Sequence, residues 1–358
     1  MWEQIRSNRI RSVVLVAALA AMLLGLGYLL GWAFFNNGLA GLIIGVVIWM
    51  IMALVAYFQG DAIVLSVSGA KKIGPNDHPR LWNVVEEMKI TSGLPKMPDV
   101  YIIDDPAMNA FATGRDPNHA AVTVTSGLLE KMNRDELQGV VAHEMSHIKN
   151  RDVLLMTLCS ILLGTIVILA WYGTRMMIFS GAGGGRRRSG GIGAALVMLL
   201  ALLLAILAPI FAQLIYFAVS RRREYLADAS GALYTRYPEG LASALEKIAA
   251  STVQLKTANQ AFAPMYTANP FRKEGRAASD LTNTHPPIQE RIRILRSMAG
   301  GASLADYNKA YGQVTKSGKG VVPGSALVDA TAVAARKPDA QASEPEKIER
   351  VRETSDLM

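Results

Sequence analysis

Two of the chain's five histidines lie four positions apart, in the stretch VVAHEMSHIKNRD from Val140 to Asp152. Residues i and i+4 lie on one face of an α-helix, so His143 and His147 can present their imidazoles to a single metal ion. Glu144 projects close to that face and can take a proton from a water molecule that the metal activates. His-Glu-x-x-His on a helix is the pattern of zinc metallopeptidases. The alternative is a solvated helix face that carries ordinary histidines.

A catalytic zinc site of this kind needs a third protein ligand and an open position for water. The stretch SRRREYLADASG, from Ser220 to Gly231, contains Glu224 and, one turn later, Asp228. Glu224 can be the third ligand, while Asp228 can accept a hydrogen bond from a ligating histidine. Taken alone, the two would be a surface acidic pair beside arginines. Together with His-Glu-x-x-His they favour one Zn²⁺ per chain, although this ligand set also suits neighbouring divalent ions.

Local signals predict the elements that hold these residues. Asn133, with Glu136 three positions later, forms a capping-box pair, so we expect a helix that begins there and carries the two histidines. The stretch VYIIDD, from Val100 to Asp105, is typical of a strand. Residues 109–114 and 120–125 flank a turn with glycine and proline, which predicts a hairpin.

Two uncharged blocks near the N-terminus are long enough to cross a bilayer. They run from Ser12 to Phe35 and from Gly38 to Phe58, and each exceeds the roughly 20 residues that a spanning helix needs. The first is too long for the apolar region of a cleaved signal, so we predict a retained transmembrane hairpin. Arginines precede the first block, and Lys71, Lys72 and Arg80 follow the second. The positive-inside rule therefore places both flanks in the cytoplasm.

Two further apolar blocks, 153–179 and 191–220, follow the zinc motif and are separated by the basic loop GAGGGRRRSGG. Because His143 and Glu224 must meet on one side of the membrane, the chain between them must cross it an even number of times. A spanning hairpin satisfies this condition, and so does a pair that never crosses. Four spans in total are favoured over two, although the arginines of the loop would then lie outside.

Composition supports a membrane enzyme with a separate tail. Hydrophobic residues make up 51% of the 358 residues, and the net charge is +8. Basic residues cluster beside membrane segments, and the sequence has no motif for nucleic acid, so the expected partner is the lipid bilayer rather than nucleic acid. We predict a hairpin at 1–60, a first catalytic part at 61–152, a second apolar pair at 153–219, a second catalytic part at 220–314 and a disordered tail at 315–358.

At this point the chain resembles a known family, the HtpX-type membrane zinc metalloproteases, which are related to the CAAX prenyl endopeptidases. The resemblance covers roughly residues 6–295 and rests on motifs in the same order: NAFATG, VTSGLL, HEMSHIKNRD, SRRREYLADASG and THPPIQERI. It implies an α+β protein. A multi-span helical membrane anchor would carry a mostly helical, zincin-like (gluzincin) catalytic domain with a small β-sheet.

The resemblance also implies roles for individual residues. The zinc ligands would be His143, His147 and Glu224, Glu144 would be the general base, and Asp228 would orient a ligand. The segment NAFATG would be an edge strand on which an extended substrate adds as a further strand. From the residues alone it is an ordinary hairpin arm. Its substrate-binding residues would be Asn109, Ala110, Phe111, Ala112 and Thr113.

Four other residues are less certain candidates. By the resemblance, His285 in THPPIQERI would stand near the developing oxyanion, and Arg291 would support the same region. The alternative is that this stretch merely starts a helix, and for Arg291 that interpretation is favoured. Asn150 and Asp152 are expected to hold the helix end where it enters the apolar block.

The function that the resemblance implies is a stress-response endopeptidase of the bacterial cytoplasmic (inner) membrane, multi-pass, with its active site facing the cytoplasm. It would cleave misfolded or unassembled membrane proteins as quality control. A prenyl-protein endopeptidase is the nearest rival, but should have more spans. A non-catalytic zinc-binding adaptor is the second alternative, although structural zinc sites normally have four protein ligands. The oligomeric state does not follow from the sequence.

Overall fold

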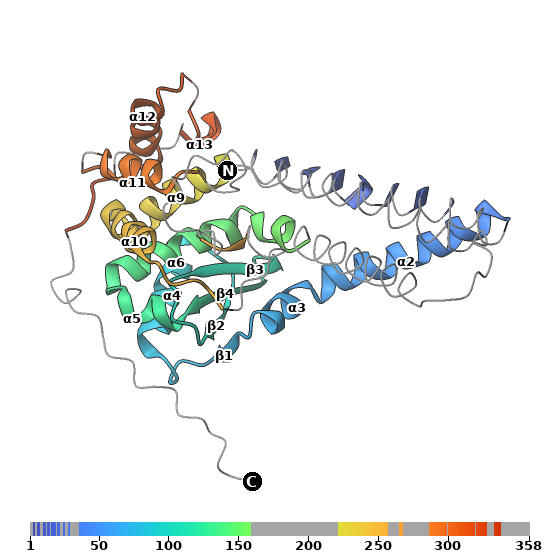
Figure 1. The fold of residues 1–358 in the computed structure, drawn as a ribbon. Coiled ribbons are helices and arrows are strands. Elements are labelled where there is room, and N and C mark those ends of the chain that lie inside the picture. Colours follow the sequence, from blue (N-terminus) through green and yellow to red (C-terminus); the bar gives the residue numbers. More distant parts are fainter. Residues whose placement is uncertain are drawn as a thin grey trace, which may run out of the picture.

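A computed structural model describes residues 36–158, 221–256, 265–267, 286–298, 300–318, 320–327 and 333–337, with scattered positions before residue 36. Figure 1 shows helix α2 (Gly38–Phe58) extending away from a body that contains the sheet and most of the helices. Within the described residues, α2 is the one helix long and apolar enough to cross a membrane, with a mean hydropathy of 2.8. Its bounds are those of the second expected span. Of the two further blocks, expected at 153–179 and 191–220, residues 153–158 are described and helical, and the rest lie outside the described residues.

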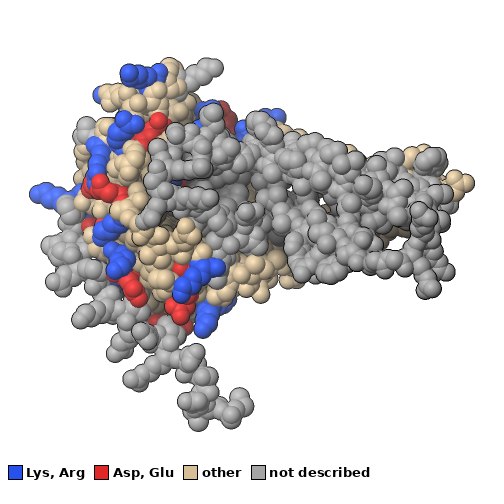
Figure 2. Space-filling model, viewed as in Figure 1, with Lys and Arg blue, Asp and Glu red and all other residues tan. Residues whose placement is uncertain are grey.

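Charge follows the same division. On the face shown in Figure 2, the coloured Lys, Arg, Asp and Glu side chains lie over the body, and α2 itself carries none. A helix without charge that is mostly exposed in the isolated chain is stable only where apolar surroundings replace water. The division therefore supports a body beside the membrane and a helix within it.

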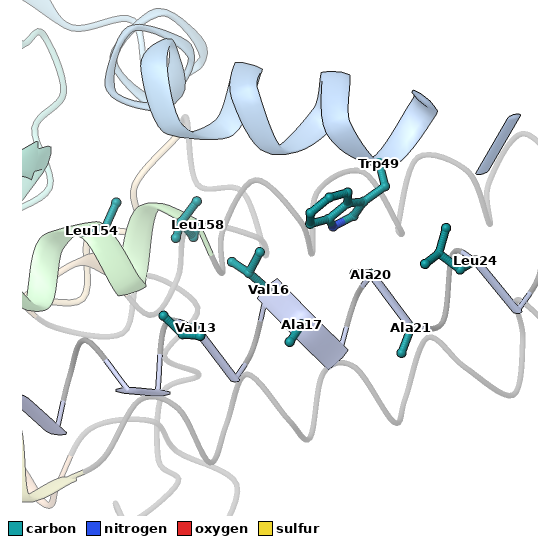
Figure 3. A pocket seen from close by; sticks show the side chains of 9 residues that line it. All are labelled: Val13, Val16, Ala17, Ala20, Ala21, Leu24, Trp49, Leu154 and Leu158. Carbon is teal, nitrogen blue, oxygen red and sulfur yellow. The ribbon is translucent and has the colours of Figure 1, made fainter. Parts of the chain in front are cut away.

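An apolar groove of about 650 Å³ lies beside α2 (Figure 3). Trp49 of α2 lines it, together with Leu154 and Leu158, which follow the zinc motif. The N-terminal segment contributes residues that share one helical face, namely Val13, Val16, Ala17, Ala20, Ala21 and Leu24. The N-terminal segment and α2 thus lie side by side, as a hairpin requires. That both cross the bilayer stays a prediction.

The body contains a four-stranded sheet in the order β1-β2-β4-β3. Its strands are β1 (Lys71–Ile73), β2 (Asp99–Ile103), β3 (Ala110–Asp116) and β4 (His119–Thr125). Strands β2 and β4 run parallel, and β3 and β4 form the predicted antiparallel hairpin. Among the described strands β3 is an edge. Gly114 has φ +137° where the β3–β4 register shifts, and a Cβ there would lie 2.2 Å from the carbonyl oxygen of His119, so only glycine fits.

Helix α6 (Arg134–Lys149) lies at the centre of the body and packs against β3, β4 and three helices. Asn133 caps its N-terminus, and the side chain of Glu136 accepts a hydrogen bond from the Asn133 N–H, which confirms the predicted capping box. The helix is buried almost all round, as is typical of a helix inside a core. The other described helices are α3 (Gly60–Val67), α4 (Pro79–Ser92), α5 (Ser126–Lys131), α9 (Arg221–Thr235), α10 (Pro238–Ala250), α11 (Ile288–Arg296), α12 (Leu304–Thr315) and α13 (Gly324–Leu327).

Part of the expected tail packs on the body. Val321 and Val322 are buried, and the Nε of Arg222 donates to the carbonyl oxygen of Val321 at 3.1 Å. Arg336 pairs with Asp135 at the start of α6. The expected disorder does not hold for these residues, because isolated apolar and basic side chains in a polar stretch find partners that local composition does not reveal.

The close approach of α6 and α10 depends on Gly139. A Cβ at this position would lie 2.6 Å from the Leu241 backbone nitrogen, so a side chain would force the two helices apart. We predict that Gly139→Ala lowers the free energy of unfolding by about 1–3 kcal/mol. The matched control is Gly312→Ala in α12, where a Cβ would meet its nearest neighbour at 3.7 Å. Equal thermal midpoints for both variants would contradict this account.

Candidate metal centre

Helices α6 and α9 bring together the three residues expected to bind a metal. The Nε2 atoms of His143 and His147 are 3.2 Å apart, and each lies 3.6 Å from a carboxylate oxygen of Glu224. All three side chains are buried. At this point Gly231 of α9 faces α6, where a Cβ would lie in van der Waals contact, 3.4 Å from the His143 nitrogen. The cluster has the composition and the compactness of a metal site.

Each histidine also contacts an aspartate through its other ring nitrogen. His143 Nδ1 lies 3.0 Å from Asp228 Oδ1, and His147 Nδ1 lies 3.0 Å from Asp152 Oδ2. An ionised carboxylate can only accept hydrogen bonds, so each Nδ1 carries a proton and each Nε2 is the nitrogen left to bind a metal. Asp228 therefore lies where the expected orienting role requires. Asp152, expected only to hold a helix end, bears the same relation to His147.

These donor atoms fit a cation. Two imidazole lone pairs that face each other at 3.2 Å, next to a carboxylate, repel one another unless positive charge lies between them. The same need for positive charge affects the pKa of His143. Burial alone would lower this pKa, but the hydrogen bond to Asp228 and the proximity of Glu224 outweigh burial and raise it to about 9. A metal ion that binds here displaces that proton.

Arg291 of α11 is buried directly behind Asp228. Its Nε and Nη2 donate to the two carboxylate oxygens at 2.8 and 2.6 Å, a bidentate pair. Burial would raise the pKa of Asp228, but the attraction of Arg291 outweighs it and lowers this pKa. Asp228 thus stays ionised and can accept from His143. The stretch does start a helix, α11, and Arg291 in addition contacts Asp228 from it.

Arg223 of α9 has a similar place beside the second aspartate. Its side chain is buried, and its Nη1 lies 3.8 Å from Asp152 Oδ1. Each ring therefore has an aspartate at Nδ1, and each aspartate has a buried arginine nearby.

The sequence does contain a signal for the burial of Arg291. Arg291 lies on the stripe Ile288, Arg291, Ile292 and Leu295, whose spacing is that of the buried face of an amphipathic helix.

Glu144, which lies between the two histidines in the sequence, is buried, and its two carboxylate oxygens differ in their hydrogen bonding. Oε1 accepts a hydrogen bond from Thr267 Oγ1 at 2.7 Å. Among the described residues, Oε2 has no hydrogen-bond partner. A buried carboxylate oxygen without a partner is costly, so its place is one for a water molecule or a substrate group. This is what a general base next to a metal needs.

The expected substrate strand lies beside the same helix. Strand β3 packs against α6, and the five residues from Asn109 to Thr113 are buried. Asn109 pairs with β4, because its carbonyl oxygen accepts a hydrogen bond from the Thr125 N–H at 3.0 Å. His285, expected near the oxyanion, lies outside the described residues.

Comparison with known proteins decides the family. Residues 75–299 match peptidase family M48. The chain belongs to peptidase family M48. It is therefore a metal-dependent protease, and the alternative of a non-catalytic adaptor is set aside.

Several named relatives cover more than four fifths of this M48 chain. A protein named "Protease HtpX homolog" from Caldanaerobacter subterraneus subsp. tengcongensis is 46% identical over 296 residues, which is 82% of this chain and 97% of the relative. Proteins of the same name from Dictyoglomus turgidum and Streptococcus pneumoniae are 45% and 43% identical, over 85% and 83% of this chain and 97% and 100% of theirs. The resemblance to HtpX-type proteases is confirmed, and the protein is a membrane-associated metallopeptidase.

One solved structure is also similar. The crystal structure of S. mikatae Ste24p aligns with 82% of this M48 chain and 67% of its own, at 20% identity and a TM-score of 0.44.

The two aspartates provide a test of the site. We predict that Asp152→Ala weakens zinc binding by about 10–100-fold, because His147 loses the partner that fixes its ring. The matched control is Asp99→Ala, which removes an exposed carboxylate paired with Lys72. Zinc affinity is measured by competition with a chelator. Unchanged affinity in Asp152→Ala would limit this residue to the helix end.

Proposed function

We propose that the protein is a zinc endopeptidase of the bacterial cytoplasmic membrane that cleaves misfolded or unassembled membrane proteins on the cytoplasmic side. The observation that carries the proposal is Glu144. One of its oxygens is fixed, and the other is buried without a partner among the described residues, next to His143, His147 and Glu224. A purely structural zinc site has no use for such a group.

In the proposed mechanism, His143, His147 and Glu224 hold one zinc ion per chain. The ion would polarise the scissile carbonyl and acidify a water molecule. Glu144 takes a proton from the attacking water at Oε2 and returns it to the leaving amine. Asp228 and Asp152 keep the two imidazoles in the tautomer that directs Nε2 to the metal.

The proposed substrate is an extended segment that adds to β3. Because the Asn109 carbonyl faces β4, the backbone groups of Ala110 and Ala112 face away from the sheet. The Ala110 carbonyl already accepts from the Thr267 N–H, so substrate pairing begins at Ala112. A strand reads the substrate backbone more than its side chains. This suits an enzyme for unfolded proteins of many sequences.

The proposed orientation rests on the residues that follow α2. Lys71 and Lys72 are exposed on β1, directly after α3, and α3 follows the apolar helix without a long loop. The positive-inside rule assigns such a flank to the cytoplasm. The body that β1 belongs to would therefore be cytoplasmic.

The catalytic proposal is tested with the full chain in detergent. It is purified with a chelator, zinc is restored, and digestion of an unfolded protein is followed. We predict that Glu144→Ala loses at least about 100-fold in kcat while still binding one zinc. The matched control is Glu130→Ala, an exposed glutamate on α5, which should cleave like the parent.

Three results would contradict the proposal. Equal cleavage by Glu144→Ala and the parent would remove Glu144 from the base role. Full activity without zinc would remove the metal. Cleavage confined to prenylated peptides would favour the prenyl-protein endopeptidase instead.

The orientation has its own test. Asn76 lies in the exposed turn after β1. In a Cys159→Ser background, we predict that Asn76→Cys reacts with a membrane-impermeant maleimide in inverted membrane vesicles and not in intact spheroplasts, because the body faces the cytoplasm. Labelling in spheroplasts would place the body on the opposite side.

A further inference from the structure

We propose that Thr267 is a positioning residue for Glu144 and that it ties the base to the edge strand β3. The inference rests on the proposed function and deepens it. Thr267 lies outside every motif in the sequence, 123 positions after Glu144, in a short described segment between α10 and α11.

Three contacts define the place of Thr267. Its hydroxyl oxygen lies 2.7 Å from Glu144 Oε1 and 2.9 Å from the Ala110 carbonyl oxygen. Its backbone N–H donates to the same Ala110 oxygen at 2.9 Å. The side chain is buried, so water does not compete for these bonds.

The hydroxyl carries one proton and faces two acceptors. Because the Ala110 oxygen is already satisfied by the Thr267 N–H, the hydroxyl proton is available for Glu144. The bond engages Oε1 and leaves Oε2 as the oxygen that exchanges a proton with water. When Glu144 holds that proton on Oε2, Oε1 remains an acceptor, so the hydroxyl keeps its hydrogen bond to the glutamate in both protonation states.

Thr267 is itself held from two directions. The preceding residue, Tyr266, is buried and packs edge-to-face on Phe111 of β3, with ring centroids 5.3 Å apart. Arg291 Nη1 lies 3.5 Å from the Thr267 carbonyl oxygen. The base, the substrate strand and the arginine behind the metal ligands are thus joined through one residue. Displacement of Glu144 relative to β3 would move the base relative to a bound substrate.

The test compares Thr267→Val with Thr267→Ser in the full chain with zinc. Valine keeps the volume and the N–H but removes the hydroxyl, whereas serine restores the hydroxyl. We expect Thr267→Val to lower kcat by about 10–100-fold with KM and bound zinc unchanged. Thr267→Ser should retain most of the parent kcat. The matched control is Thr91→Val, which removes a hydroxyl bonded to the Met88 carbonyl on α4.

Two kinetic results would overturn the proposal. Faster cleavage with a lower KM in Thr267→Val would mean that the segment around Thr267 obstructs substrate binding. Equal losses in the valine and serine variants would mean that the hydroxyl is not the group that matters.

A second measurement does not depend on activity. The thermal midpoints of Thr267→Val, Glu144→Ala and the double variant form a double-mutant cycle. We expect non-additive shifts, because each single change removes the same bond. Additive shifts would overturn the contact. If the parent shows no zinc-dependent cleavage, the proposed function fails, and this cycle still decides whether Thr267 holds Glu144.

Discussion

The structure depends on a concentration of lone pairs and negative charge in its interior. Two imidazole nitrogens and the Glu224 carboxylate converge within 4.8 Å, and two further carboxylates stand behind the histidines. Such a cluster is unfavourable unless cations neutralise it. The buried guanidinium groups of Arg291 and Arg223 supply fixed positive charge on its outer side. A metal ion held by His143, His147 and Glu224 would supply it at the centre. The arginines thus stabilise the aspartates, and the aspartates fix the imidazoles.

This constraint accounts for the packing of α6. The helix must bring its histidines to α9 on one side and Glu144 to β3 on another, so it cannot expose a polar face to water. A small residue helps to make this possible, since Gly139 admits α10 at close range. Helices that approach through glycine hold their side chains in narrowly defined positions, which a metal site requires. The contacts that pack α6 into the core are therefore also the contacts that position the site residues.

Local patterns in the sequence were sufficient for the parts that local geometry decides. The i, i+4 spacing of His143 and His147, the capping pair at Asn133 and the β3–β4 hairpin follow from periods and turn chemistry within a few residues. Glu224 could be assigned because the His-Glu-x-x-His motif needs a third ligand and an acidic residue on a later helix can supply it.

The remaining site residues required the tertiary structure. Thr267 contacts Glu144 across 123 positions, from a stretch without any pattern, so no local rule could select it. Asp152 was assigned to the helix end because its contact with His147 depends on how the chain leaves α6. The packing of part of the tail was missed for a related reason, since the partners of Arg336, which include Asp135 and Thr235, lie on helices that are distant in the sequence. Only Arg291 had a signal in sequence, as the charged member of an otherwise apolar stripe.

The position of the edge strand relative to α2 bears on the choice of substrate. Helix α3, which follows α2, packs on β3, and the Arg115 guanidinium of β3 lies 5.6 Å from the ring of Phe58 at the last position of α2. The end of the apolar helix and the proposed substrate strand are thus in contact. A segment that leaves the bilayer next to α2 would meet the outward groups of β3 within a few residues, whereas a soluble protein would have to unfold close to the membrane surface to reach them. Because the strand reads backbone, selection would come from this location and from the unfolded state of the segment, not from side-chain recognition. In the proposed function, a strand attached to a membrane helix would therefore direct an otherwise unselective peptidase toward membrane proteins that have failed to fold.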